Sequence, residues 1–229
     1  MKLWFLLLFI GLFSCDKDQT VDFDGDENRR QINYLALGDS YTIGQSVCTT
    51  CRFPEQLKAN LRATYPNNPF LLQVIAKTGW TTTNLLTEIN LVNPSTNFDL
   101  VTLLIGVNNQ YQNRPFSLYE TEFPQLVAKA ITLAKGDKTN VIVVSIPDYA
   151  YTPFGQGAVN ISTGIDQYNT FAQNYCTENG IVFINITDIT RLGLSQPELV
   201  ANDGLHPSEL AYSKFVERIL PKALLSLEN

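Results

Sequence analysis

Five short apolar runs, each followed by turn residues, alternate along the chain with stretches of helical periodicity. The runs cover residues 32–37, 70–76, 100–105, 141–146 and 181–186. A run of this length with few polar interruptions is typical of a strand that is buried on both faces. Strands of this kind that alternate with helices build a parallel sheet. The sequence therefore predicts the α/β fold class, a three-layer α/β/α domain around a five-stranded parallel sheet.

Helices are expected between these strands because apolar residues recur there every three or four positions. The stripes contain Phe53, Leu57 and Leu61, then Leu85, Leu86, Ile89 and Val92, then Ile165, Tyr168, Ala172 and Tyr175, and finally Tyr212, Phe215 or Val216, and Ile219. A further helix is expected to open with a capping box at Ser117 and Glu120 and to end near Ala134. Pro124 falls inside it and predicts a kink or a later start. The last helix should follow Ser208.

Length and charge narrow the possible functions. The chain has 229 residues, of which 45% are hydrophobic and 17% are charged, a composition typical of globular proteins. The formal net charge is −6. Acidic residues gather in 16–27, and no stripe of Lys and Arg is visible. A nucleic acid is therefore not an expected partner.

The first fifteen residues predict export. An apolar run at 3–13 is shorter than the roughly 20 residues that a bilayer span needs, but it suits a secretory signal. It leads into Ser14-Cys15, which resembles a bacterial lipobox, although Phe13 is bulkier than that pattern prefers. The alternative is an ordinary signal peptide with a chance cysteine.

The domain organisation follows from this interpretation. We expect a signal peptide at 1–14, a lipidated Cys15 with an acidic tether at 15–30, and one folded domain at 31–229. The protein would then be exported and held to a bacterial membrane only through its lipid.

The other cysteines allow several interpretations. Cys48 and Cys51 have the spacing of a redox pair, of half a zinc site or of a local disulfide. Zinc is disfavoured because only Cys176 and one histidine remain as ligands. A redox pair is expected at a helix N-terminus directly after a strand. In this chain the segment 38–41, and not the cysteine pair, follows the first predicted strand. A local disulfide or two loop thiols is the favoured interpretation, and Cys176 is expected to be a buried thiol on a helical stripe.

Chemistry-bearing residues follow four of the predicted strands. They lie in the segments 38–41, 77–80, 106–109 and 203–207. Because the carboxyl ends of parallel strands meet at one edge of a sheet, these segments should converge there. They contain a serine, a glycine, an asparagine and His206, the single histidine of the chain. Imidazole is the usual general base near neutral pH.

These blocks identify a resemblance. Gly38-Asp39-Ser40, Gly79, Gly106-Val107-Asn108 and Asp203-Gly204-Leu205-His206 resemble, in order, the four blocks of the SGNH hydrolases, also called GDSL esterases and lipases. The resemblance runs from about Tyr34 to Pro207. One departure is Asn109, where the family usually has Asp. The resemblance implies a flavodoxin-like fold and ester hydrolysis without a metal or cofactor.

The predicted roles follow from acyl-transfer chemistry. Ser40 would be the nucleophile, activated by His206 as base, and Asp203 would orient the imidazole. The resemblance assigns the oxyanion hole to the backbone N–H groups of Ser40 and Gly79 and to the side-chain amide of Asn108. Asp39 is expected to hold the turn. Taken singly, each of these residues could instead be an ordinary cap, turn or loop residue.

Related chemistries are disfavoured. Thr42 stands where the Gly-x-Ser-x-Gly elbow of α/β-hydrolases would have glycine. No phosphate-binding loop of the Walker type is present, and a single histidine disfavours a His-rich metal cluster.

The expected substrate is an ester, either a small molecule or a glycan, with a short acyl or acetyl group. Aromatic residues after the third and fourth strands either line its pocket or are ordinary buried residues: Tyr111, Phe116, Tyr149, Tyr151 and Phe154. We take Tyr111 and Tyr149 as the substrate-binding candidates. The competing functions are a lipoprotein that binds a glycan or lipid without turnover, and a thiol–disulfide protein that uses Cys48 and Cys51.

Overall fold

The computed structural model describes Met1 and residues 30–228. The predicted signal segment, the lipid-attachment residue Cys15 and the acidic tether lie almost wholly in 2–29, outside the described residues. Within the described part of the chain, no helix is both long and apolar enough to cross a membrane.

The described residues contain one five-stranded sheet in which every neighbouring pair is parallel. Its strands are β1 (Ile32–Gly38), β2 (Phe70–Ala76), β3 (Leu100–Leu104), β4 (Val141–Val144) and β5 (Val182–Ile184). Their order is β2-β1-β3-β4-β5. Strand β1 pairs with β2 from Ile32↔Phe70 and with β3 from Tyr34↔Leu100. The predicted sheet is confirmed, although β4 and β5 are shorter than their apolar runs.

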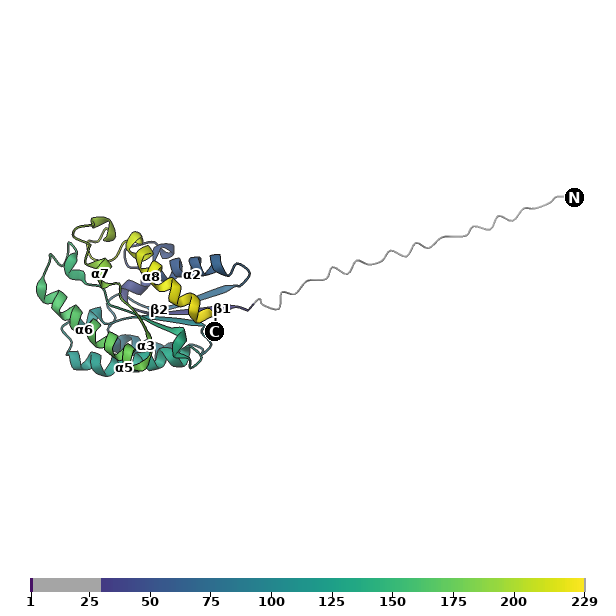
Figure 1. Cartoon of the computed structure of the whole chain (residues 1–229), viewed down its shortest axis with the longest axis horizontal. Coiled ribbons are helices and arrows are strands. Elements are labelled where there is room, and N and C mark those ends of the chain that lie inside the picture. The colour runs from purple at the N-terminus through teal and green to yellow at the C-terminus, as the bar shows by residue number, and fades with distance from the viewer. Residues whose placement is uncertain (2–29, 229) are drawn as a thin grey trace.

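Helices cover both faces of the sheet. The long ones are α2 (Phe53–Thr64), α3 (Thr82–Val92), α5 (Phe116–Leu133), α6 (Val159–Asn179) and α8 (Glu209–Leu227). The short ones are α1 (Ser40–Ile43), α4 (Val107–Tyr111) and α7 (Thr187–Thr190). Helices α2 and α8 pack together on one face, and α3, α5 and α6 pack on the other (Figure 1). The three-layer α/β/α prediction is therefore confirmed.

The start of α5 corrects one prediction. The helix begins at Phe116 with Pro115 as its N-cap, and no side chain caps it. The N–H of Leu118 bonds to the carbonyl of Pro115, so helical bonding starts before Ser117 can act as a cap. The expected capping box is wrong for this reason. The helix also does not start after Pro124, which lies inside it. Ser208 does cap α8, as expected.

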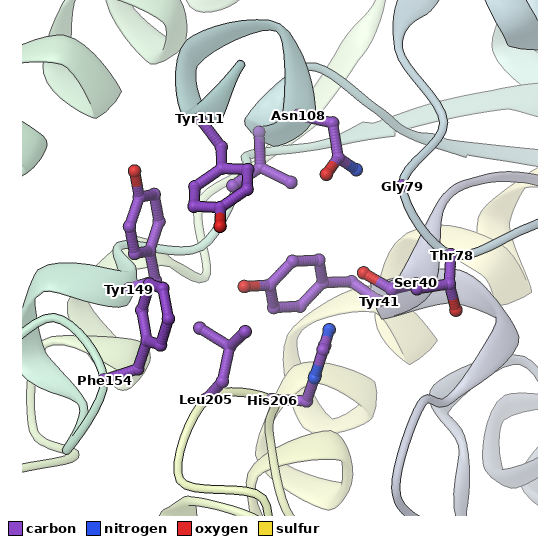
Figure 2. Close-up of a pocket in the computed structure, with 11 residues that line it drawn as sticks. Ser40, Tyr41, Thr78, Gly79, Asn108, Tyr111, Tyr149, Phe154, Leu205 and His206 are labelled. Carbon is purple, nitrogen blue, oxygen red and sulfur yellow. The ribbon is translucent and has the colours of Figure 1, made fainter.

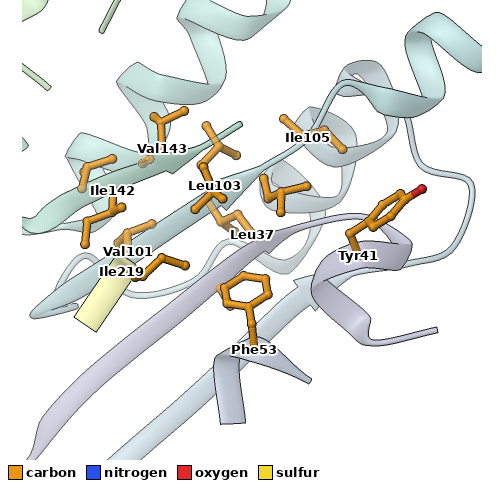
Figure 3. Packing of buried hydrophobic residues seen from close by; sticks show 14 of the residues in the cluster. Leu37, Tyr41, Phe53, Val101, Leu103, Ile105, Ile142, Val143 and Ile219 are labelled. Atoms are coloured by element: carbon orange, nitrogen blue, oxygen red, sulfur yellow. The ribbon is translucent and has the colours of Figure 1, made fainter. Parts of the chain in front are cut away.

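The core forms between the sheet and both helical layers. Phe53 of α2 and Ile219 of α8 pack with strand residues such as Leu37 and Val101 (Figure 3). Each large apolar side chain buried in this way contributes about 1.5–3 kcal/mol. Cys176 is also fully buried, as predicted. This packing fixes the strands, and through them the loops at their carboxyl ends.

The favoured interpretation of the close cysteine pair is confirmed. Cys48 and Cys51 form a disulfide around a 3-10 turn, Thr49–Cys51, which is exposed and precedes α2. The bond lies in the loop between α1 and α2, and not at the start of a helix that directly follows a strand.

Candidate active site

A pocket of about 210 Å³ opens at the carboxyl ends of the strands. The loops after β1, β2, β3 and β4, together with the segment before α8, contribute its lining (Figure 2). The lining residues are Ser40, Tyr41, Thr78, Gly79, Val107, Asn108, Tyr111, Tyr149, Phe154, Leu205 and His206. The fold thus brings together all of the residues predicted for catalysis, the oxyanion hole and substrate binding except Asp203, which contacts His206 and does not itself line the pocket.

Ser40 is the first residue of α1, directly after β1. Asp39 is the N-cap, and its carboxylate accepts a hydrogen bond from the N–H of Tyr41 at 3.0 Å. The turn requires glycine at position 38, because a Cβ there would lie 2.1 Å from Thr42 Oγ1 and 2.4 Å from the carbonyl oxygen of Leu104. As the first helical residue, Ser40 has an N–H without a partner inside the helix. Ser40 thus offers the pocket both its side-chain hydroxyl and its backbone N–H as a hydrogen-bond donor.

His206 lies in the segment before α8, and Asp203 holds its ring. Its Nδ1 lies 2.7 Å from Asp203 Oδ2, an arrangement in which Nδ1–H donates to the carboxylate and Nε2 remains an acceptor. The imidazole is largely buried, lies 5.1 Å from the ring of Tyr41 between centroids, and points into the pocket (Figure 2). Within residues 30–228, no hydrogen bond joins Ser40 to His206, although both face the same cavity. Such contacts often tighten only when substrate is bound.

The Asp203 carboxylate is stabilised as an anion. Partial burial opposes its ionisation, but hydrogen bonds from Ser46, from the backbone and ring of His206 and from the backbone of Leu205 hold its pKa well below the usual range. The carboxylate is therefore charged at any pH near neutrality. An ionised partner is what an imidazole that becomes protonated requires.

Gly79 and Asn108 form the other side of the pocket. Gly79 has a φ of +84°, which favours glycine, and nothing lies within 4 Å of the position a Cβ would take. No acceptor in the described part of the chain bonds its N–H. The Asn108 amide donates to the Trp80 carbonyl at 3.0 Å and more weakly to Asp39 Oδ2 at 3.4 Å. Donors thus border the pocket beside Ser40.

Asn109, which stands where the resemblance predicts Asp, forms hydrogen bonds to Thr82, just after the loop that carries Gly79. Its Oδ1 accepts from the N–H of Thr82 at 2.9 Å, and its Nδ2 donates to the Thr82 hydroxyl at 2.7 Å. Gln112 donates to the carbonyl of Gly79 at 2.9 Å. Side chains on and just beyond α4 therefore fasten the loop that carries Gly79.

Asp39 carries an unusual charge state. Complete burial raises the pKa of Asp39 to about 7, against the lowering effect of hydrogen bonds from the Tyr41 backbone and the Asn108 amide. Its carboxyl faces Asn108 and caps α1, which agrees with the expected role in holding the turn.

Aromatic side chains form the end of the pocket away from Ser40 (Figure 2). The rings of Tyr111, Tyr149 and Phe154 lie about 6 Å apart between centroids, and Tyr149 donates to Gln110 Oε1 at 2.8 Å. Two of the five aromatic candidates do not line this pocket: Phe116 opens α5 and packs in a cluster with Tyr119, Tyr168 and Phe171, and Tyr151 lies outside the lining.

Sequence reasoning missed several lining residues, notably Tyr41, Leu205 and Thr78. Tyr41 directly follows Ser40, and its ring extends along the pocket between the aromatic end and His206 (Figure 2). Ser46, which bonds Asp203, was also missed. No group of three or more His, Cys, Asp or Glu side chains in the described residues is arranged to hold a metal ion.

Comparisons with known proteins identify the family and the fold. The profile of the GDSL-like Lipase/Acylhydrolase family matches residues 36–214. No curated protein matches the chain. Many solved structures share the fold, and three of them illustrate it. A member of the lipolytic protein G-D-S-L family from Veillonella parvula is 19% identical, with a TM-score of 0.63, over 83% of this chain and 97% of that one.

The other two structures are similar to the same extent. An acetylxylan esterase from Geobacillus stearothermophilus is 19% identical with a TM-score of 0.64, over 85% of this chain and 95% of that one. A lipase/acylhydrolase from Enterococcus faecalis is 18% identical with a TM-score of 0.65, over 84% and 95%.

A parallel α/β/α fold with a serine, a histidine and backbone donors around one pocket defines a class of hydrolytic enzymes. The chain belongs to the GDSL-like lipase/acylhydrolase family, and it is a carboxylic ester hydrolase.

Proposed function

We propose that the protein is a serine esterase of short acyl esters that works through an acyl-enzyme. Ser40 is the nucleophile, His206 the base and Asp203 the residue that orients the base. The observation that supports this most strongly is the His206–Asp203 pair, joined at 2.7 Å, with its imidazole in the pocket that Ser40 also lines.

The chemical steps follow from these positions. Ser40 Oγ attacks the ester carbonyl carbon while His206 Nε2 takes the hydroxyl proton. The tetrahedral intermediate collapses, the bond to the alcohol oxygen breaks, and the imidazolium returns the proton to that oxygen. Water then repeats the sequence on the acyl-enzyme, which releases the acid and restores Ser40. Asp203, which is ionised, stabilises the imidazolium in both halves.

The oxyanion that forms in each half needs fixed donors. The N–H groups of Ser40 and Gly79 are free of partners among the described residues, and the Asn108 amide lies beside them. One amide hydrogen of Asn108 is used by Trp80. The other has only the long contact to Asp39, so it is available to a developing negative charge.

The pocket favours a small acyl group. Its volume of about 210 Å³ is below the range of about 300–1,000 Å³ that is usual for drug-sized ligands. The exposed aromatic side chains at its outer end, Tyr111 and Phe154, offer faces on which a sugar ring could pack. Acetylated glycans are therefore included in the proposed substrate class, and one structurally similar protein is named an acetylxylan esterase.

Replacement of the nucleophile tests this function. Ser40→Ala should abolish hydrolysis of p-nitrophenyl acetate without unfolding the protein, and an organophosphonate should label Ser40 alone. Ser195→Ala, which removes an exposed hydroxyl that donates to the Leu192 carbonyl, is the matched control. Wild-type activity in Ser40→Ala, or binding of acetylated sugars without turnover, would favour the competing interpretation as a binding lipoprotein.

A series of substrates tests the acyl length. We expect kcat/KM to fall from p-nitrophenyl acetate to butyrate and octanoate, and acetylated xylo-oligosaccharides to release acetate. A maximum at octanoate would contradict the small pocket as the determinant of specificity.

We also propose that the chain is exported and anchored through a lipid on Cys15, on the basis of the sequence alone. Expressed in bacteria with its full N-terminus, the wild-type chain should incorporate labelled palmitate and Cys15→Ser should not. Equal labelling of both would contradict the anchor.

A further inference from the structure

The loop at 44–52, between α1 and α2, forms hydrogen bonds to both sides of the pocket without lining it. Gln45 Oε1 accepts from the Thr78 hydroxyl at 2.6 Å, next to Gly79. Ser46 Oγ donates to Asp203 Oδ2, also at 2.6 Å. Ser46 has a φ of +66°, a conformation uncommon for residues other than glycine. The loop therefore turns sharply where it meets Asp203.

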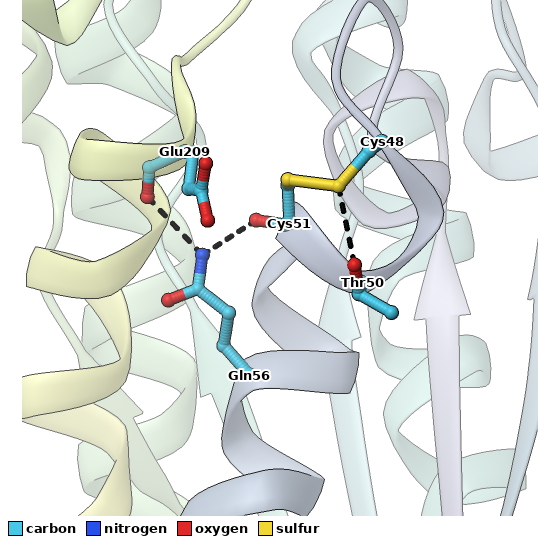
Figure 4. The surroundings of a disulfide bond; sticks show 5 residues. All are labelled: Cys48, Thr50, Cys51, Gln56 and Glu209. Atoms are coloured by element: carbon cyan, nitrogen blue, oxygen red, sulfur yellow. Dashed lines mark hydrogen bonds between the residues drawn. A yellow bond between two sulfur atoms is a disulfide. The ribbon is translucent and has the colours of Figure 1, made fainter.

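The other end of this loop is also attached to the segment that carries His206. The disulfide closes the turn from Cys48 to Cys51. Gln56 of α2 donates to the Cys51 carbonyl at 2.5 Å and to the Glu209 carbonyl at 3.1 Å (Figure 4). Glu209 is the first residue of α8. The loop is thus fixed against the 203–209 segment at two points.

Asp203 depends on such contacts because packing does not immobilise it. Its side chain is 29% exposed. Oδ1 accepts from the N–H groups of Leu205 and His206 at 2.9 and 3.0 Å. Oδ2 is the atom that bonds His206 Nδ1, and Ser46 is the other residue that bonds it. The hydroxyl of Ser46 therefore acts on the oxygen that orients the imidazole.

We propose that Ser46 is a positioning residue for ester hydrolysis, whose hydroxyl holds the Asp203 carboxylate in the orientation that aligns His206. This inference rests on the proposed function, in which Asp203 orients the base. Because Ser46 does not line the pocket, its contribution belongs to kcat and not to substrate binding.

Two substitutions of Ser46 provide the first test. Ser46→Ala and Ser46→Gly should each lower kcat for p-nitrophenyl acetate by about three- to tenfold, the effect of one net hydrogen bond, and leave KM unchanged. Glycine also relieves the positive φ, so equal losses in the two variants assign the effect to the hydroxyl. The control is Ser95→Ala, which removes an exposed hydroxyl bonded at 2.6 Å to Asn97 before β3, and it should keep wild-type kcat.

A double-mutant cycle with Asp203→Ala distinguishes positioning from a general structural role. If Ser46 acts through Asp203, the double variant should have the same kcat as Asp203→Ala alone. Losses that multiply, a changed KM, or wild-type kcat in Ser46→Ala would overturn the inference. Failure of the underlying function has a different signature, because then ester hydrolysis would survive Ser40→Ala.

Discussion

The two sides of the pocket are held in place by different means. On the side of Gly79 and Asn108, the supporting side chains of Asp39 and Asn109 are fully buried and bond to loop or helix backbone. On the side of His206, Asp203 and Ser46 are exposed, and hydrogen bonds together with a nearby disulfide replace packing. The comparison teaches that the donors expected to stabilise the oxyanion are fixed by buried side chains, whereas the carboxylate of Asp203, which holds the buried His206 ring, is fixed by hydrogen bonds nearer the surface.

The largest effect is expected on the buried side. Asn108→Ala should lower kcat by about 10²- to 10³-fold, the usual loss for an oxyanion donor. KM should change little, since the bond strengthens as charge develops. Steady-state kinetics together with a melting curve would check this. If kcat is retained and only stability falls, Asn108 is a structural residue of the Gly79 loop.

Asn109→Ala tests whether the neighbouring amide has only a structural role. It leaves the buried N–H of Thr82 without its acceptor, so the free energy of unfolding should fall by about 1–3 kcal/mol. The kcat at a temperature where the variant is folded should stay within a few-fold of wild type. Denaturant titration and kinetics measure the two quantities. A loss of kcat as large as that of Asn108→Ala would mean that Asn109, and not Asn108, donates to the oxyanion.

The exposed side should respond to loss of the disulfide. Cys48→Ser with Cys51→Ser opens a very short loop, so chain entropy limits the expected stability loss to about 2 kcal/mol. The kcat should fall by no more than Ser46→Ala does, because the contacts of Gln56 remain. The contacts of Asn108, on the other side of the pocket, should be unaffected. A loss larger than that of Ser46→Ala would mean that the bond also supports Gln45 and the Gly79 loop.

The last prediction concerns the pH dependence of stability and the Asp39 carboxyl. Burial raises the pKa of Asp39 to about 7, above the value of about 3.9 of an unfolded aspartate. Its protonation therefore adds stability that is fully present below about pH 3.9 and is lost as the pH rises through about 7. Asp39→Asn keeps a capping side chain without the charge. The advantage in melting temperature of Asp39→Asn over wild type should therefore grow as the pH rises from about 4 to about 7 and stay constant above that, and a difference that does not change between about pH 4 and about pH 7 would contradict the raised pKa of Asp39.

Much of the site could be predicted from the sequence because it depends on strand ends. In a parallel sheet, the residues after each strand share one edge, so Ser40, Gly79, Asn108 and His206 were expected to meet, and all four line one pocket. Asp203 could be paired with His206 because only three positions of chain separate them. These inferences need only the order of the elements.

The missed features depend on local paths that spacing does not encode. Ser46 reaches Asp203 only because the chain turns through a positive φ after α1. The start of α5 depends on Pro115, whose fixed backbone angle lets the helix begin before the expected cap. The direction of the Tyr41 ring depends on how the first turn of α1 leaves β1.

The burial of Cys176 has a consequence for oxidative folding. Within the described residues, this thiol could compete with Cys48 and Cys51 for a partner while the chain is open. Once α6 docks, burial raises the pKa of Cys176 to about 12, and the thiolate that disulfide exchange requires is almost absent at neutral pH. Formation of the core therefore disfavours wrong disulfides. It withdraws Cys176 from thiol–disulfide exchange and leaves Cys48 and Cys51, at the surface, free to be oxidised to each other.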